Sequence, residues 1–357
     1  MFEVSVIIPT FNEADNILKV IHQIESNLDG CNYEIIVVDD NSPDGTSEIV
    51  KNYTKINNRI FCIKRTWKKG LSSAVVEGVG LASKRHICVM DGDGQHNPEN
   101  IKNFISCIQD NDIDLVSGSR FLHTPNVEGL SKSRHELSQT GIKVTNFFLE
   151  NDISDPLSGF FLMKRDKFLE LQGSLYKDGF KILFDMLMLD KTLKHKEIAI
   201  DFRDRISGDS KLNISTLFNL IGQIIENISR GLIPANFVVF SFVGTLGVFV
   251  HLLILSILLA LGGPFILSNG LSTILAMSSN YLLNNYLTFH NLHRLISERI
   301  KGFLKYCFVN SFSIFANIGI ASQFYLNEFS AITSALFGII AGLVLNYFLS
   351  VNLVFNK

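Results

Sequence analysis

The chain has 357 residues and a formal net charge of −2 at pH 7, from 32 Lys and Arg against 34 Asp and Glu. This balance gives no support to a nucleic-acid partner, which would need a basic surface. The five cysteines are odd in number, scattered and without metal-ligand spacing, which argues against a disulfide framework and fits a reducing cytosol. The length allows two or three domains.

Short apolar runs alternate with helical patterns along the first 90 residues. Strands are predicted at 4–9, 34–39, 60–64 and 86–90, and helices at 14–27, 46–56 and 71–83. Strands that are apolar throughout and separated by helices predict a parallel sheet, because helices then cover both of its faces. We therefore expect an α/β domain with a mostly parallel, Rossmann-like sheet.

Polar clusters follow three of these predicted strands, as TFNE at 10–13, DDNS at 39–42 and DGD at 91–93. Open α/β sheets bind their ligands at the carboxyl ends of the strands, so these clusters predict one ligand site at that edge. No GxGxxG motif follows the first strand, where Pro9 and Thr10 stand instead. A dinucleotide-binding oxidoreductase is therefore disfavoured.

The segment CVMDGDGQHNPE, from Cys88 to Glu99, places oxygen side chains at alternate positions. Asp91, Asp93 and Gln95 offer hard ligands that suit Mg²⁺ or Mn²⁺ rather than zinc. A divalent ion held there could bind a diphosphate and neutralise the charge that develops on it as a leaving group. Taken alone, the same residues also fit an ordinary Asp-Gly turn after a strand.

The last third of the chain is apolar enough to lie in a membrane. Residues 232–289 contain no Asp, Glu, Lys or Arg, and residues 306–356 contain only Glu328. Spans of that length exceed the roughly 20 residues that cross a bilayer. Two pairs of segments repeat at an offset of 66, so we expect two hairpins, with four helices near 236–261, 265–289, 303–326 and 329–354.

The charges of the loops predict the orientation of these helices. The central loop carries Arg294, Arg299, Lys301 and Lys305, whereas the outer loops LGGPF and LNEFS carry no basic residue. The positive-inside rule then places the preceding domain in the cytoplasm. Between the two parts, residues 214–232 are strongly amphipathic, which fits a helix on the soluble core as well as a helix in the membrane interface.

Four segments carry a family resemblance, namely PTFNE at 9–13, VVDDNSPDGT at 37–46, KGLSSA at 69–74 and MDGDGQH at 90–96. In order and spacing they resemble the family-two inverting glycosyltransferases with the A-type fold. VVDDNSPDGT resembles, more narrowly, the polyprenol-phosphate (dolichol-phosphate) mannose synthases. The resemblance continues to about residue 215, through SRF at 119–121, SR at 133–134, SDPLSGF at 154–160, FRDR at 202–205 and SKL at 210–212. The membrane part resembles the GtrA-type four-helix domains fused to some of these synthases.

The resemblance implies roles for the matching residues. The nucleoside would be held by Pro9, Phe11, Glu13, Val38 and Asp40, with Lys69, Gly70 and Gly92 also in the donor site. Asp91, Asp93 and Gln95 would carry the metal and the diphosphate, and Arg205 and Lys211 would close over it from the loop SGDSKL. Arg120, Arg134 and Ser138 would bind a lipid phosphate, and Asp155 and Ser158 would line the sugar pocket. Where Gly92 and Gly94 stand, the family more often has Ala or Leu, so we expect a more flexible loop here.

We therefore expect an A-type transferase domain at 1–213, an amphipathic interface helix at 214–232 and a GtrA-like transmembrane domain at 233–357. The expected reaction is inverting, metal-dependent transfer of mannose from GDP-mannose to a polyprenyl or dolichyl phosphate. Transfer of glucose from UDP-glucose to the same acceptor is an alternative that no residue excludes. A lipid-linked sugar flippase with a degenerate nucleotide-sensing domain is an alternative from another class, which the intact Asp91, Asp93, Arg134 and Lys211 disfavour.

Overall fold

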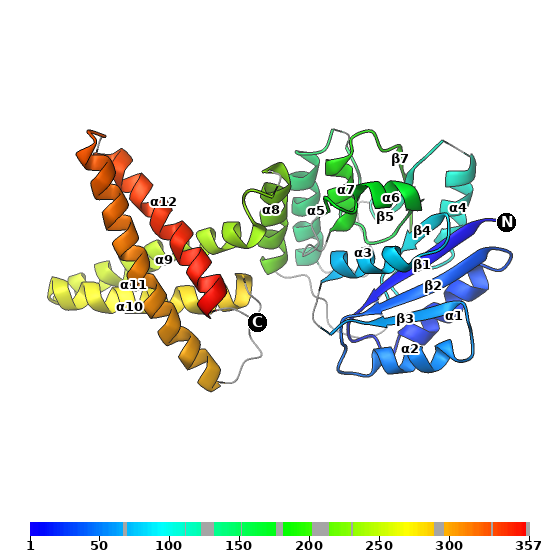
Figure 1. The fold of residues 1–357 in the computed structure, drawn as a ribbon, viewed down its shortest axis with the longest axis horizontal. Coiled ribbons are helices and arrows are strands. Elements are labelled where there is room, and N and C mark those ends of the chain that lie inside the picture. Colours follow the sequence, from blue (N-terminus) through cyan, green and yellow to red (C-terminus); the bar gives the residue numbers. More distant parts are fainter. Residues whose placement is uncertain are drawn as a thin grey trace. The chain divides into compact units, whose positions relative to one another are not determined.

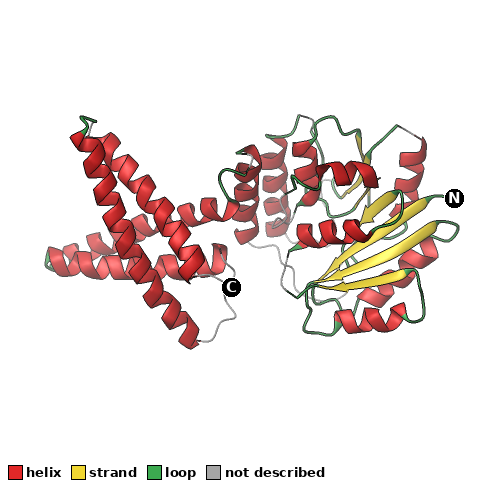
Figure 2. Cartoon of the chain, viewed as in Figure 1, coloured by secondary structure: helices red, strands yellow, loops and turns green. Residues whose placement is uncertain are grey.

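The computed structural model divides the chain into two compact units, Met1–Asn213 and Ile214–Lys357. It describes all residues except 67–69, 111, 123–131, 151, 176–180, 202–213, 230, 289–295, 330 and 355–357. All described strands lie in the first unit, and the second unit is built from helices (Figures 1 and 2).

The first unit is organised around one seven-stranded sheet with the order β3-β2-β1-β4-β6-β5-β7. Its strands are β1 (Glu3–Thr10), β2 (Asn32–Asp39), β3 (Ile60–Lys64), β4 (His86–Val89), β5 (Leu115–Ser119), β6 (Phe161–Lys164) and β7 (His195–Ala199). Among the strands of the described residues, only β6 runs antiparallel to its neighbours, β4 and β5. The predicted α/β class with a mostly parallel sheet is confirmed.

Helices cover both faces of this sheet, as the apolar strands predict. One face carries α1 (Ile17–Asn27), α2 (Thr46–Thr54) and α4 (Asn100–Asp110), and the other carries α3 (Leu71–Leu81), α6 (Arg165–Leu171) and α7 (Ile182–Leu189). A further helix, α5 (Lys132–Asn146), precedes β6. Helix α1 begins three residues later than predicted, because Asn12 has a φ of 60° and the carbonyl of Glu13 closes a turn onto the backbone N–H of Asn16.

The reversed strand β6 decides which loops meet. Strands β4 and β5 run in the same direction, and β6 lies antiparallel between them, so β6 starts at the edge where β4 and β5 end. The segment before β6, 154–160, therefore lies at the same edge as the ends of β4 and β5. This edge is the one at which the polar clusters of the sequence stand.

The second unit consists of α8 (Ile214–Ile228), α9 (Ala235–Ala260), α10 (Phe265–Leu283), α11 (Ile296–Leu326) and α12 (Ala331–Leu349), with the π-helical segments η1 (Asn284–Thr288) and η2 (Ser350–Val354). Helix α8 packs on α9: the rings of Phe218 and Phe242 lie 4.5 Å apart, and Glu226 Oε2 accepts from the N–H of Ala235 at 2.7 Å. Among the described residues, α9 alone is a helix both long and apolar enough to cross a membrane by itself.

The internal repeat has a structural counterpart. The segments η1 and η2 begin at Asn284 and Ser350, which are 66 residues apart, the offset of the sequence repeat. The second repeat also contains a partly buried polar contact between helices, in which Asn346 Nδ2 donates to Asn310 Oδ1 at 3.0 Å. Ser350 Oγ extends it by donating to Asn346 Oδ1 at 3.1 Å.

His195 on β7 should make the first unit sensitive to acid. Burial lowers the pKa of His195 to about 4, and its Nε2 lies 2.7 Å from Ser117 Oγ on β5. The unfolded chain binds this proton near pH 6.5 and the folded chain does not, so the free energy of unfolding should fall as the pH falls from about 6.5 to about 4. Thermal unfolding of the full chain in detergent across this range, compared between wild type and His195→Gln, measures the effect. The variant should lose less stability toward acid, and identical slopes would contradict the assignment.

Candidate active site

The carboxyl edge of the sheet brings together residues that are far apart in the sequence. Strands β1, β2 and β4 end there with the clusters that follow Thr10, Asp39 and Val89, and β5 ends there with Ser119. The segment that precedes β6 adds Asp155 and Ser158. The site thus draws on at least five elements of the first unit.

Asp39, the first acid of the DDNSPDGT motif, is a framework residue. Its carboxylate is fully buried and accepts from Thr10 Oγ1 at 3.1 Å and from the N–H of Ser42 at 2.9 Å. Ser42 Oγ in turn accepts from the N–H of Asn12 at 2.9 Å, so the loops after β1 and β2 are fastened together. Asp44 adds a further hydrogen bond between these two loops, because its carboxylate accepts from the N–H of Ala14 at 3.0 Å.

Asp40, the second acid of this motif, forms a buried ion pair with Arg65. Arg65 Nε donates to Asp40 Oδ1 at 2.5 Å, while Nη1 and Nη2 donate to Ser73 Oγ at 2.8 Å and to the carbonyl of Gly70 at 3.0 Å. The N–H of Gly70 donates to the other oxygen of Asp40 at 2.8 Å. Asp40 and Gly70, both predicted in the donor site, therefore stand in one network, while Lys69 lies outside the described residues.

Sequence reasoning missed Arg65. The available signal was its position directly after β3, at the same sheet edge as the acidic clusters, but nothing in its spacing points to Asp40. The remaining residues predicted for the nucleoside lie at this edge as well. Pro9 and Val38 are neighbours across β1 and β2, and Phe11 and Glu13 are half-buried.

The acidic motif follows β4 in a tight loop. Asp93 is buried and its Oδ1 accepts from the N–H of Gln95 at 3.0 Å, while Asp91 keeps about a third of its side chain exposed. Gly94 has a φ of +78°, a conformation that glycine adopts without strain. The buried His96 fixes the start of the loop, because its Nδ1 accepts from the N–H of Asp91 at 3.2 Å and its ring stacks on Phe160.

The room around Asp91 fits a role as a ligand. A β-carbon at Gly159 would lie only 3.1 Å from Asp91 Oδ2 and 3.2 Å from Oδ1, so glycine there leaves the carboxylate uncrowded. In the described part of the chain, no three His, Cys, Asp or Glu side chains are grouped so as to hold a metal ion. A divalent ion at this edge would therefore use Asp91 and Asp93 with neutral oxygens such as that of Gln95.

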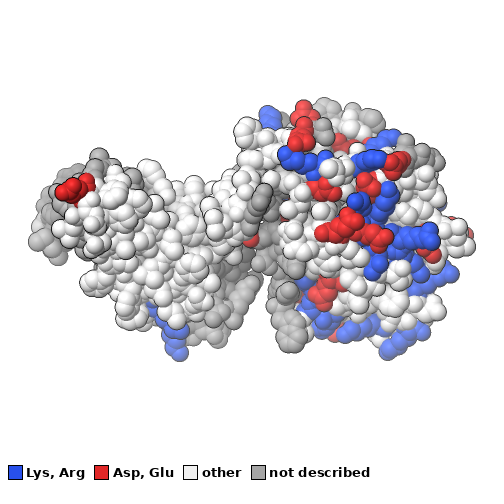
Figure 3. Space-filling view, turned by 45° about the horizontal axis from the view of Figure 1, so that its top comes forward, with Lys and Arg blue, Asp and Glu red and all other residues white. Residues whose placement is uncertain are grey.

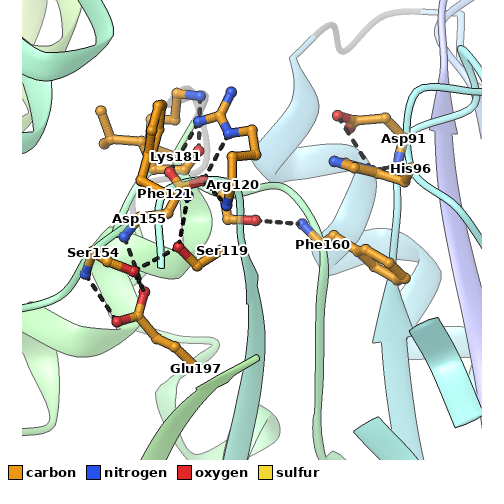
Figure 4. A network of polar contacts seen from close by, with 12 residues as sticks. Asp91, His96, Ser119, Arg120, Phe121, Ser154, Asp155, Phe160, Lys181 and Glu197 are labelled. Atoms are coloured by element: carbon orange, nitrogen blue, oxygen red, sulfur yellow. Dashed lines mark hydrogen bonds and ion pairs between the residues drawn. The ribbon is translucent and has the colours of Figure 1, made fainter. Parts of the chain in front are cut away.

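Arg120 and Asp155 form the second charged centre of the site (Figure 4). Arg120 Nε donates to Asp155 Oδ2 at 2.7 Å and Nη2 donates to Oδ1 at 2.9 Å, which is a two-pronged pair. Asp155 is completely buried, and Arg120 is about nine-tenths buried. Glu197 on β7 holds this loop from below, since its carboxylate accepts from the backbone N–H groups of Ser154 and Asp155, both at 2.9 Å.

The other predicted residues fall in different places. Ser158 is buried and its Oγ accepts from the N–H of Phe160 at 3.2 Å, and Ser138 is half-buried on α5. Arg134 lies on α5 with its side chain outside the described part, and Arg205 and Lys211 lie in the segment 202–213, which is also outside it.

Comparison with known proteins agrees with this geometry. The family model described as glycosyl transferase family 2 matches residues 5–171, and the model described as the GtrA/DPMS transmembrane domain matches residues 239–355. A dolichol-phosphate mannosyltransferase of Pyrococcus furiosus is 36% identical over 295 residues, which are 82% of each chain. This chain belongs to the dolichol-phosphate mannosyltransferase family. It is a glycosyltransferase, and the predicted family is confirmed.

More distant relatives agree with this membership. A dolichol-phosphate mannosyltransferase of Mycosarcoma maydis is 30% identical and aligns over 66% of this chain and 82% of its own length. Among solved structures, mannosyl-3-phosphoglycerate synthase from Rubrobacter xylanophilus superposes with a TM-score of 0.51 at 17% identity, over 65% of this chain and 74% of its own. That similarity shows the A-type fold of the first unit and nothing more.

Removing Asp155 should destabilise the transferase fold. Asp155→Asn leaves the Arg120 guanidinium buried without its counter-charge, which costs about 3–5 kcal/mol in comparable cases. Chemical unfolding of the full chain in detergent measures the loss. The matched control is Asp112→Asn, which breaks an exposed pair with Lys194 and should leave the free energy of unfolding nearly unchanged. The double variant Arg120→Met/Asp155→Leu should recover much of the loss, and equal effects of Asp155→Asn and the control would refute a buried pair.

Proposed function

We propose that this enzyme transfers mannose from GDP-mannose, with inversion, to the phosphate of a polyprenyl or dolichyl phosphate at the cytoplasmic face of a membrane. The observation that carries the proposal is the combination in one chain of the Asp91/Asp93 and Arg120/Asp155 centres at one sheet edge with a GtrA/DPMS transmembrane domain. A relative that is 36% identical over 82% of each chain is named as a dolichol-phosphate mannosyltransferase, which supports the proposal.

The donor would lie across the ends of β1, β2 and β4. Pro9, Phe11, Glu13, Val38 and Asp40 are proposed for the nucleoside, with Lys69, Gly70, Gly92, Arg205 and Lys211 around the diphosphate. Asp91, Asp93 and Gln95 would hold Mg²⁺ or Mn²⁺, and a bound ion would neutralise charge on the diphosphate leaving group. The Asp40–Arg65 pair supports this placement by fixing Asp40 and the Gly70 backbone together.

The acceptor would need no side-chain base. A sugar hydroxyl must lose a proton when it attacks, whereas a phosphate monoester, with a second pKa of about 6, is already ionised near neutrality. Asp155 fits this mechanism, because both of its oxygens accept from Arg120 and none of its surface reaches solvent. We assign Asp155 the role of orienting Arg120, which together with Arg134 and Ser138 would hold the acceptor phosphate close to the anomeric carbon.

The second unit would anchor the enzyme where its acceptor lies. On the face shown in Figure 3, charged side chains cover much of the first unit, whereas few stand out on the second. We propose that α9, α10, α11 and α12 all span the bilayer, with the first unit in the cytoplasm. The acceptor's hydrocarbon tail would then remain in lipid while its phosphate meets the site at the membrane surface.

Labelled-sugar transfer to a short-chain polyprenyl phosphate tests the proposed reaction. The purified full chain should transfer mannose from GDP-mannose at least about tenfold faster than glucose from UDP-glucose, the ratio that 1.4 kcal/mol of discrimination gives. Excess chelator should abolish transfer, Mg²⁺ or Mn²⁺ should restore it, and Asp93→Asn should remove activity without changing the unfolding midpoint. Preference for UDP-glucose would replace the proposed donor, and full turnover in chelator would remove the metal.

The pH dependence of transfer tests the proposal that the reaction needs no side-chain base. The rate should fall below about pH 6 as the acceptor phosphate takes up its second proton. An acceptor carrying a difluoromethylphosphonate has a lower second pKa, so the acidic limb should move to lower pH with it. If the limb stays in place when the acceptor changes, it belongs to a protein group, and a side-chain base exists.

A further inference from the structure

Lys181 stands beside the Arg120–Asp155 pair and was not singled out by any sequence motif. It directly precedes α7, and its Nζ donates to the carbonyl of Leu157 at 3.0 Å, in the same loop as Asp155 and Ser158. Figure 4 shows the ends of the Lys181 and Arg120 side chains next to each other above Asp155, and Asp91, which follows β4, to one side of them. A second cation therefore reaches the centre of the site from a separate element.

The charges around this point determine what Lys181 contributes. Arg120 and Asp155 cancel each other, because their two-pronged pair has no net charge. The Asp91 carboxylate at the end of β4 is proposed as a metal ligand, so a bound divalent ion would offset its charge. Lys181 adds a positive charge beside the neutral Arg120–Asp155 pair. An anionic acceptor would therefore gain charge attraction from the Lys181 ammonium, while Arg120 contributes hydrogen bonds.

The environment of the Lys181 ammonium disfavours its charged form. Burial and the neighbouring Arg120 lower the pKa of Lys181, and the attraction of Asp155 and Asp91 does not offset them. An anion bound beside Lys181 and Arg120 would relieve the repulsion between the two cations. A purely structural tie to the Leu157 carbonyl would need only a neutral donor.

We propose that Lys181 binds the acceptor phosphate and supplies the positive charge that Asp155 removes from Arg120. This inference rests on the proposed function and deepens it, because it adds a substrate-binding residue that neither the motifs nor the comparisons assign. The acceptor is favoured over the donor because Lys181 contacts the Asp155 loop, through the carbonyl of Leu157, whereas the Asp40–Arg65 network stands at the end of β2.

Steady-state kinetics of the full chain with GDP-mannose and short-chain polyprenyl phosphate test the proposal. Lys181→Met should raise the acceptor KM about tenfold to a hundredfold, the loss expected for one charge-assisted hydrogen bond, and should leave the donor KM nearly unchanged. Lys181→Arg keeps the charge and should retain most of the acceptor affinity. The control is Lys191→Met, which removes an exposed lysine paired with Glu150 and should change neither constant.

Lys181→Gln separates charge from tethering. Glutamine keeps an N–H donor for the Leu157 carbonyl but has no charge, so it should behave like Lys181→Met if phosphate binding is the role. Recovery by Gln, or a rise in donor KM instead of acceptor KM, would overturn the proposal. GDP-mannose binding and the unfolding midpoint of each variant report whether it is folded, and Lys181→Arg and Lys181→Gln keep the test decisive if the Met variant is not. A wild type that transfers mannose while Lys181→Met keeps its acceptor KM would overturn this inference alone, whereas a wild type without transfer would overturn the proposed function as well.

Discussion

The antiparallel insertion of β6 is the constraint on which the site depends. In a wholly parallel sheet the segment before each strand lies at the amino edge, away from the ligand. Because β6 runs the other way, the SDPLSGF segment before it arrives at the carboxyl edge, where Asp155 meets Arg120 at the end of β5. One reversed strand thus allows a buried arginine to be neutralised in the centre of the site, with Glu197 of β7 supporting the loop from its other side.

Two buried arginines have different roles along this edge of the sheet. Arg65 is nearly inaccessible and ties Asp40 to the Gly70 backbone, so it shapes the donor side of the edge. Arg120 is oriented by a completely buried acid, so it can face a ligand without collapsing onto other side chains. In both cases the carboxylate fixes the orientation of the arginine but also cancels its positive charge. Further positive charge is then needed where an anion binds. The proposed divalent ion would supply it to the diphosphate, and Lys181 would supply it to the acceptor phosphate.

The parts of the site that the sequence could predict are those that local pattern determines. Apolar strands flanked by helices specify a covered sheet, and Asp91 and Asp93 stand directly at a strand end, so their position follows from the strand. Arg65 and Lys181 could not be found in this way. Their partners are 25 and 24 residues distant, and only the pairing of β2 with β3 and the reversal of β6 bring them into contact. The packing of α8 on α9 was equally undetermined, because an amphipathic pattern shows that one face is buried without showing what buries it.

In the helical second unit, apolar surface alone does not select one arrangement of the helices in lipid. Its buried and half-buried asparagines and serines can contribute to that selection, since a polar group in an apolar environment is stabilised by a hydrogen-bond partner. Asn346 bridges α12 to Asn310 of α11 and also accepts from Ser350 at the start of η2. The wider π turn begins at equivalent positions of both repeats, so the same backbone geometry recurs at an offset of 66 residues. Hydrophobicity alone does not account for this shared backbone geometry, and the Asn346–Asn310 contact adds a directional tie between α11 and α12.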